Sequence, residues 1–87
     1  MRVLGIKDLQ RSDSQIFYIR RYSGIAEIEL PKSVEDAPVS FSIEMDCLGN
    51  KSVCLDIQKQ VDYPLLPLKK TIIEFILAED REGRLPC

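Results

Sequence analysis

The sequence predicts an α+β domain in which about five mostly antiparallel strands, two hairpins plus an N-terminal strand, are covered on one face by a single C-terminal helix. Apolar and polar residues alternate in short runs before residue 60, and a helical apolar period follows. The 87 residues suffice for one core, and 45 % apolar with 30 % charged residues is typical of a folded domain. We therefore expect one domain over 1–87, strand-rich over 1–60. A partly closed β-barrel capped by the helix is the alternative.

The N-terminal run RVLGIKDL, residues 2–9, is short and apolar, and polar QRSDSQ follows it. This pattern is typical of a strand and a loop. The next run, QIFYIRRYSGIAEIELP, allows one long strand or two strands that fold back at Ser23 and Gly24. The hairpin is favoured, because it would place Arg20 opposite Glu27 and apolar residues opposite one another.

The stretch PKSVEDAP, from Pro31 to Pro38, carries charges and no sustained period, so we expect a surface loop. A second hairpin follows, formed by VSFSIEMDC, the turn LGNKS and SVCLDIQ. Its predicted inward residues are Val39, Phe41, Ile43, Met45 and Cys47 on the first strand, and Val53, Leu55 and Ile57 on the second.

The terminal helix is predicted over about 67–82. Proline is favoured at a first helical position, here Pro67, and Gly83 is typical of a residue just past a helix end. At about 100° per residue, one apolar stripe would cover the sheet. Its members are Leu68, Ile72, Phe75 and Ile76.

Ile73 and Leu77 lie on a second stripe of this helix, turned away from the centre of the first. Covering one sheet does not require them, so they either pack beneath the N-terminal segment and the 31–38 loop or contact another chain. We expect the second outcome, because a small two-layer domain has little material left to cover them. The partner is this chain itself, as a homodimer, or another protein.

The run IFYIRRYSG is a second candidate surface. Tyr18, Arg20 and Tyr22 would line the solvent face of one strand, with Arg21 at its end. Aromatic rings stack on bases and arginines bind phosphate, so these four residues are a candidate contact for nucleic acid or a small anion. The net charge of −2 argues against a general polyanion binder. Residues 1–24 are basic and 25–46 acidic, and we expect these blocks to neutralise each other across strands.

Much catalytic chemistry is absent from the sequence. The chain has no His, which excludes His-dependent nucleophiles and metal sites, and its four glycines never cluster into a phosphate-binding loop. Glu44, Asp46 and Asp56 share the outer face of the second hairpin, where alternating carboxylates usually solvate a strand. A cation site or acid-base pair built from them is the less favoured interpretation.

Cys47 and Cys54 would point to opposite faces of the second hairpin, so they do not meet the geometry of a disulfide. We expect ordinary reduced thiols there and at Cys87. A thiol enzyme based on Cys54 would need a nearby cation, and Lys51 is the adjacent candidate.

These patterns predict a small cytoplasmic, non-enzymatic interaction or adaptor module without a cofactor, self-associating through Ile73 and Leu77 of its helix. A nucleic-acid-binding regulator is the alternative, and a carboxylate- or thiol-based enzyme or metal protein is the third. No membrane partner is expected, since the chain shows neither a signal peptide nor an apolar run of about 18 residues.

Overall fold

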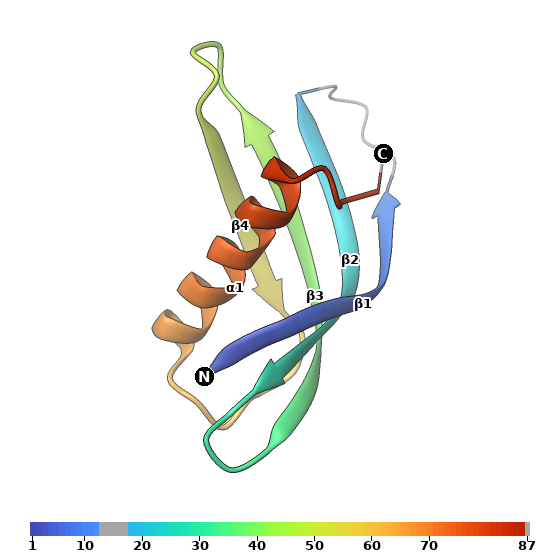
Figure 1. Ribbon diagram of the computed structural model, residues 1–87. Coiled ribbons are helices and arrows are strands. Elements are labelled where there is room, and N and C mark those ends of the chain that lie inside the picture. Colours follow the sequence, from blue (N-terminus) through green and yellow to red (C-terminus); the bar gives the residue numbers. More distant parts are fainter. Residues whose placement is uncertain (13–17, 87) are drawn as a thin grey trace.

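The computed structural model describes residues 1–12 and 18–86 and contains one antiparallel sheet and one helix (Figure 1). The strands are β1 (Arg2–Ser12), β2 (Ile19–Glu29), β3 (Val34–Met45) and β4 (Lys51–Ile57), and the helix is α1 (Leu65–Arg81). The strand order β1-β2-β3-β4 leaves β1 and β4 as the edges of an open sheet. The α+β class is confirmed. The described part of the chain has four strands rather than about five, and the sheet is not closed into a barrel.

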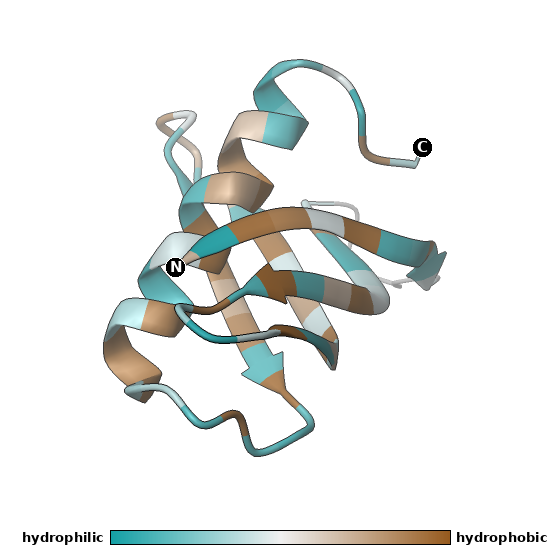
Figure 2. Cartoon of the chain, turned by 60° about the horizontal axis from the view of Figure 1, so that its bottom comes forward, coloured by the Kyte–Doolittle hydropathy of each residue, from teal (hydrophilic) through white to brown (hydrophobic). Residues whose placement is uncertain are grey.

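The core lies between α1 and one face of the sheet, with the helix against β4 and β1 (Figure 1). Hydrophobic and hydrophilic residues alternate along the strands (Figure 2), because successive side chains point to opposite faces. The predicted covering stripe of the helix is confirmed, with Phe75 half-buried at its edge. The buried residues are Val3, Tyr22, Ala26, Ile28, Leu30, Ala37, Val39, Phe41, Ile43, Leu68, Ile72 and Ile76.

β2 continues through Ser23 and Gly24 without turning, so the predicted hairpin is wrong and Gly24 pairs with Val39. Gly24 permits a close approach of strands instead. A Cβ there would lie 2.8 Å from Ile6 Cγ2 and 3.0 Å from the carbonyl oxygen of Lys7. Glycine in a strand marks either a turn or a position where another backbone comes close, and here the second applies.

The predicted surface loop from Pro31 to Pro38 is also wrong, since β3 begins at Val34 and includes Pro38. Proline lacks the N–H that an inner strand needs. The carbonyl oxygen of Pro38 accepts a hydrogen bond from the N–H of Gln58, just beyond the end of β4. The nitrogen of Pro38 faces the same side, so the missing N–H falls where the ladder is already ending.

The basic and acidic blocks meet across the strands, as predicted. Arg2 pairs with Glu29 at 3.3 Å, and Lys7 pairs with Asp36 at 2.8 Å and with Glu27 at 3.8 Å. These pairs are partly exposed, and such pairs contribute about 0–1 kcal/mol each. They therefore neutralise the surface more than they stabilise the fold.

α1 begins at Leu65, two residues earlier than predicted, with Pro64 at the N-cap. Pro67 is the third helical residue, where a missing N–H is harmless because the first turn has no intrahelical acceptors. Gly83 follows the helix with a φ of 72°, a left-handed conformation that glycine adopts without strain. The earlier start adds Leu65 and Leu66 to the helix.

Candidate interaction surface

An apolar stripe runs along the side of α1 that faces away from the core. Leu66 is 81 % exposed, and Ile73 and Leu77 are half-buried but are not among the described side chains that pack against the core. These three side chains lie within about 40° of one another around the helix axis, and their centre is about 120° from that of buried Ile72. We call Leu66, Ile73 and Leu77 the outer stripe.

The outer stripe has the spacing of a helix-pairing seam. Leu66 and Ile73 are seven residues apart and Leu77 follows after four, as at the apolar positions of a heptad. The sequence identifies Ile73 and Leu77, but it misses Leu66 because the predicted helix begins at Pro67. Recognising Pro64 as the residue before the first turn would have found Leu66.

Asp80, in the last turn of α1, ties the helix to one end of the sheet. Its side chain is only 7 % exposed, and its carboxylate accepts hydrogen bonds from Arg20 Nη1 at 3.0 Å and Lys51 Nζ at 2.6 Å. The bond from Arg20 is the main cause that lowers the pKa of Asp80, with Lys51 contributing and desolvation opposing. The same bond raises the pKa of Arg20. The arrangement fixes the level at which the helix ends.

Beyond that level the inner face of the sheet is uncovered and forms a depression of about 600 Å³, which we call the end hollow. Its lining is mainly apolar and consists of Tyr18, Arg20, Ile43, Glu44, Met45, Asp46 and Cys47. The prediction that Met45 and Cys47 lie in the core is wrong, since both are exposed. The reason is that α1 stops at Asp80, level with Arg20, and does not reach them.

The four residues of the predicted anion surface do not share a face. Tyr22 is 2 % exposed and stacks on Phe41 with ring centroids 5.1 Å apart. Its hydroxyl donates to the carbonyl oxygen of Pro86 at 3.0 Å and accepts from Arg20 at 3.3 Å. The prediction that Tyr22 lies on the solvent face is wrong, because an unbroken β2 turns Tyr22 and Arg20 inward and Arg21 outward.

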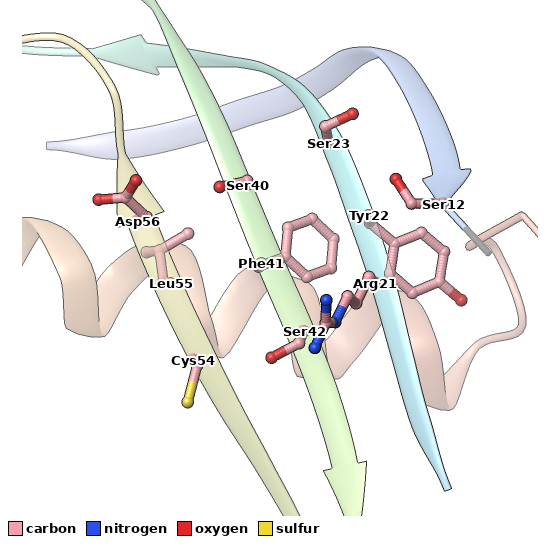
Figure 3. Close-up of a pocket in the computed structure, with 10 residues that line it drawn as sticks. All are labelled: Ser12, Arg21, Tyr22, Ser23, Ser40, Phe41, Ser42, Cys54, Leu55 and Asp56. Carbon is pink, nitrogen blue, oxygen red and sulfur yellow. The ribbon is translucent and has the colours of Figure 1, made fainter. Parts of the chain in front are cut away.

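Arg21 lies in a second depression, of about 420 Å³, on the face of the sheet opposite α1 (Figure 3). Ser12 on β1 and Ser42 on β3 are its direct neighbours across the strands. Ser23, Ser40, Cys54 and Asp56 add further polar side chains around it (Figure 3). Arg21 forms no ion pair with any described residue, so its guanidinium is open to a ligand.

The predicted carboxylate set is spread out. Glu44 is on β3 and Asp56 on β4, whereas Asp46 is in the turn between these strands and accepts hydrogen bonds from the N–H groups of Asn50 and Leu48, both at 2.9 Å. These bonds, with that of Asn50 first, lower the pKa of Asp46. In residues 1–12 and 18–86, no group of three His, Cys, Asp or Glu side chains is arranged to hold a metal ion.

The thiols are separate as well. Cys47 and Cys54 are both free and exposed. Cys87 lies outside the described residues. Cys47 is the thiol that borders the end hollow, and Cys54 borders the depression around Arg21.

A protein-family model matches residues 1–79, which include all four strands and most of α1. The chain belongs to the BB_0187 family. No curated protein and no solved structure matches it. The region that this family shares contains the outer stripe and every residue that lines the end hollow. Within the described ranges, none of the helices has the length and apolarity needed to cross a membrane.

Proposed function

We propose that this chain is a small, non-enzymatic, cytoplasmic interaction module that self-associates through the outer stripe of α1. The observation that carries the proposal is the exposure of Leu66 together with the outward position of Ile73 and Leu77. Apolar side chains aligned along one helix face are a typical docking surface for a second helix.

The spacing of the stripe favours a second copy as the partner. If two α1 helices pack antiparallel about a twofold axis near residues 71 and 72, Leu66 of each protomer faces the partner's Leu77. Ile73 then faces the partner's Lys70, whose aliphatic part covers it while the ammonium group reaches water. A twofold contact of one patch with itself is the commonest arrangement of soluble oligomers.

The energy is compatible with a reversible dimer. Full burial of an exposed Leu or Ile side chain contributes roughly 1.5–3 kcal/mol. The six side chains of two stripes therefore supply at most about 9–18 kcal/mol, and less because Ile73 and Leu77 are already half-buried. Association costs about 4–15 kcal/mol, so the stripe alone supports at most moderate affinity.

The test is the mass of the chain in solution, measured by sedimentation. Ile73→Gln combined with Leu77→Gln should give the monomer mass while the circular dichroism spectrum remains that of the unmodified chain. Leu66→Gln should weaken association too, and its exposure makes damage to the core negligible. Leu4→Gln is the matched control, since Leu4 is an exposed apolar residue on edge strand β1. A stripe variant that stays as dimeric as the control contradicts the proposal.

A second candidate function is the binding of an anion by Arg21, favoured by its position between Ser12 and Ser42 and by the lack of an ion-pair partner among the described residues. A nucleic-acid version is less supported, because Tyr22 is buried and cannot stack on a base. Amide shifts around Arg21 on addition of inorganic phosphate, lost in Arg21→Ala, would support this candidate. Salt-sensitive retention of an oligonucleotide by the unmodified chain would favour the nucleic-acid version.

A further inference from the structure

We infer that the dimer is antiparallel and that Leu65, the first residue of α1, docks in the end hollow of the partner. The inference rests on the proposed self-association through α1, and it adds a second contact region that the outer stripe does not include.

The size of a stable interface calls for such an extension. Specific interfaces bury about 800 Å² per partner. That is about one seventh of the 5916 Å² that this chain exposes. Three side chains, two of them already half-buried, do not supply this area, so a specific dimer needs surface beyond the stripe.

The helix geometry directs the extension to the end hollow. When Leu66 faces the partner's Leu77, the residue before it lies further toward the partner's helix C-terminus. That is the end at which Asp80 binds Arg20, and Arg20 lines the end hollow. Leu65 is therefore the nearest exposed apolar side chain on the partner helix.

The sides of the helix agree with this placement. Measured around the axis from Leu66, the side chains of Leu65, Lys69 and Asp80 are displaced by about 100°, 60° and 40° in the same direction. A twofold axis perpendicular to two antiparallel helices brings this flank of one helix against the same flank of the other. Leu65 thus approaches the partner on the side of Asp80 and the end hollow.

The chemistry of the two surfaces matches. Leu65 is 55 % exposed, and the end hollow offers apolar surface from Tyr18, Ile43 and Met45. Lys69 lies one helical turn after Leu65, and Glu44 and Asp46 line the hollow. None of these three charged groups forms an ion pair with a described residue. Docking would bring the ammonium group of Lys69 beside the two carboxylates.

A native thiol in the end hollow makes the inference testable. Cys54→Ser and Cys87→Ser leave Cys47 as the single cysteine. In that background Leu65→Cys places a second thiol at the helix start, and a short bismaleimide reagent is added. We expect a covalent dimer linked between position 47 of one chain and position 65 of the other. Mixed isotope-labelled and unlabelled chains, digested and analysed by mass spectrometry, identify the link as intermolecular.

Val34→Cys in the same background is the matched control, because Val34 is also 55 % exposed but lies on the sheet face opposite α1. If the protein sediments as a dimer and the position-65 thiol links to Cys47 no more than the control thiol does, this docking is wrong and self-association stands. If the unmodified chain sediments as a monomer, the proposed function fails as well.

A charge exchange gives an independent readout. Lys69→Glu and Glu44→Lys should each weaken the dimer, and the two together should recover most of the loss, because the pair is restored with reversed signs. Losses that simply add in the double variant would overturn the contact. Asp46 is left unchanged because its carboxylate holds the turn between β3 and β4.

Discussion

Arg20 on β2 and Asp80 on α1 form an ion pair at 3.0 Å, although sixty residues separate them in the sequence. Lys51 on β4 binds the other oxygen of the same carboxylate. One side chain thus joins the helix to two strands. It also sets the point at which the inner face of the sheet emerges from beneath the helix, and the end hollow begins there.

Replacing Asp80 by Asn should lower the free energy of unfolding at pH 7 by roughly 1–3 kcal/mol, because two cations lose their charged partner in a largely buried place. Urea denaturation measures the loss. Asp56→Asn is the control, since Asp56 is an exposed carboxylate that forms no ion pair with a described residue. An equal, small effect of both changes would contradict a structural role for Asp80.

The effect of Asp80 should depend on pH. Its pKa is lower in the folded protein than in the unfolded chain, where a free aspartate titrates near about 3.9. The stabilisation is therefore fully present above about pH 4 and is lost as the pH falls through the folded pKa. The stability difference between the unmodified chain and Asp80→Asn should shrink as the pH drops below about 4. Denaturation curves from neutral to strongly acidic pH check this, and a constant difference would exclude the ion pair as its source.

Gly24→Ala should destabilise the fold by about 1–3 kcal/mol, because the added methyl group would collide with Ile6 Cγ2 and the carbonyl oxygen of Lys7. Without that collision, alanine would stabilise slightly by restricting the unfolded chain. Gly5→Ala is the control, since no atom of a described residue lies within 4 Å of the place that its methyl group would take. Thermal unfolding of both variants distinguishes the two, and equal midpoints would contradict the close approach.

Tyr22→Phe should keep the stacking on Phe41 but remove the hydroxyl that donates to Pro86. We expect a loss of about 0.5–1.5 kcal/mol and faster hydrogen exchange at the amides of Arg84 and Leu85, which precede Pro86. Tyr63→Phe is the control, because the hydroxyl of Tyr63 forms no hydrogen bond with the part of the chain that the structure describes. Unchanged exchange in Tyr22→Phe would show that the bond does not hold the C-terminal segment.

Much of the architecture follows from local pattern. The alternation of β4 and of the second half of β3 predicts their inward residues, and the 3.6-residue period predicts which side of α1 is buried. The Ser23–Gly24 pair is ambiguous in sequence, because a turn and a close approach of strands both favour glycine. Reading one strand as two reverses the inward and outward faces, which places Tyr22 outside although it is buried.

The candidate surfaces were only partly predictable. Ile73 and Leu77 follow from helical period alone, whereas Leu66 depends on where the helix begins. The end hollow depends on where the helix ends relative to the sheet. That level is set by the bond between Asp80 and Arg20, a long-range contact that no local pattern contains.

The most direct test of self-association is the mass of the unmodified chain by sedimentation equilibrium over a range of concentrations. Two chains of 10.0 kDa each should associate reversibly, so the measured mass should rise with concentration toward twice the monomer value. A mass of 10.0 kDa at every concentration, for a chain shown by circular dichroism to be folded, would contradict the account.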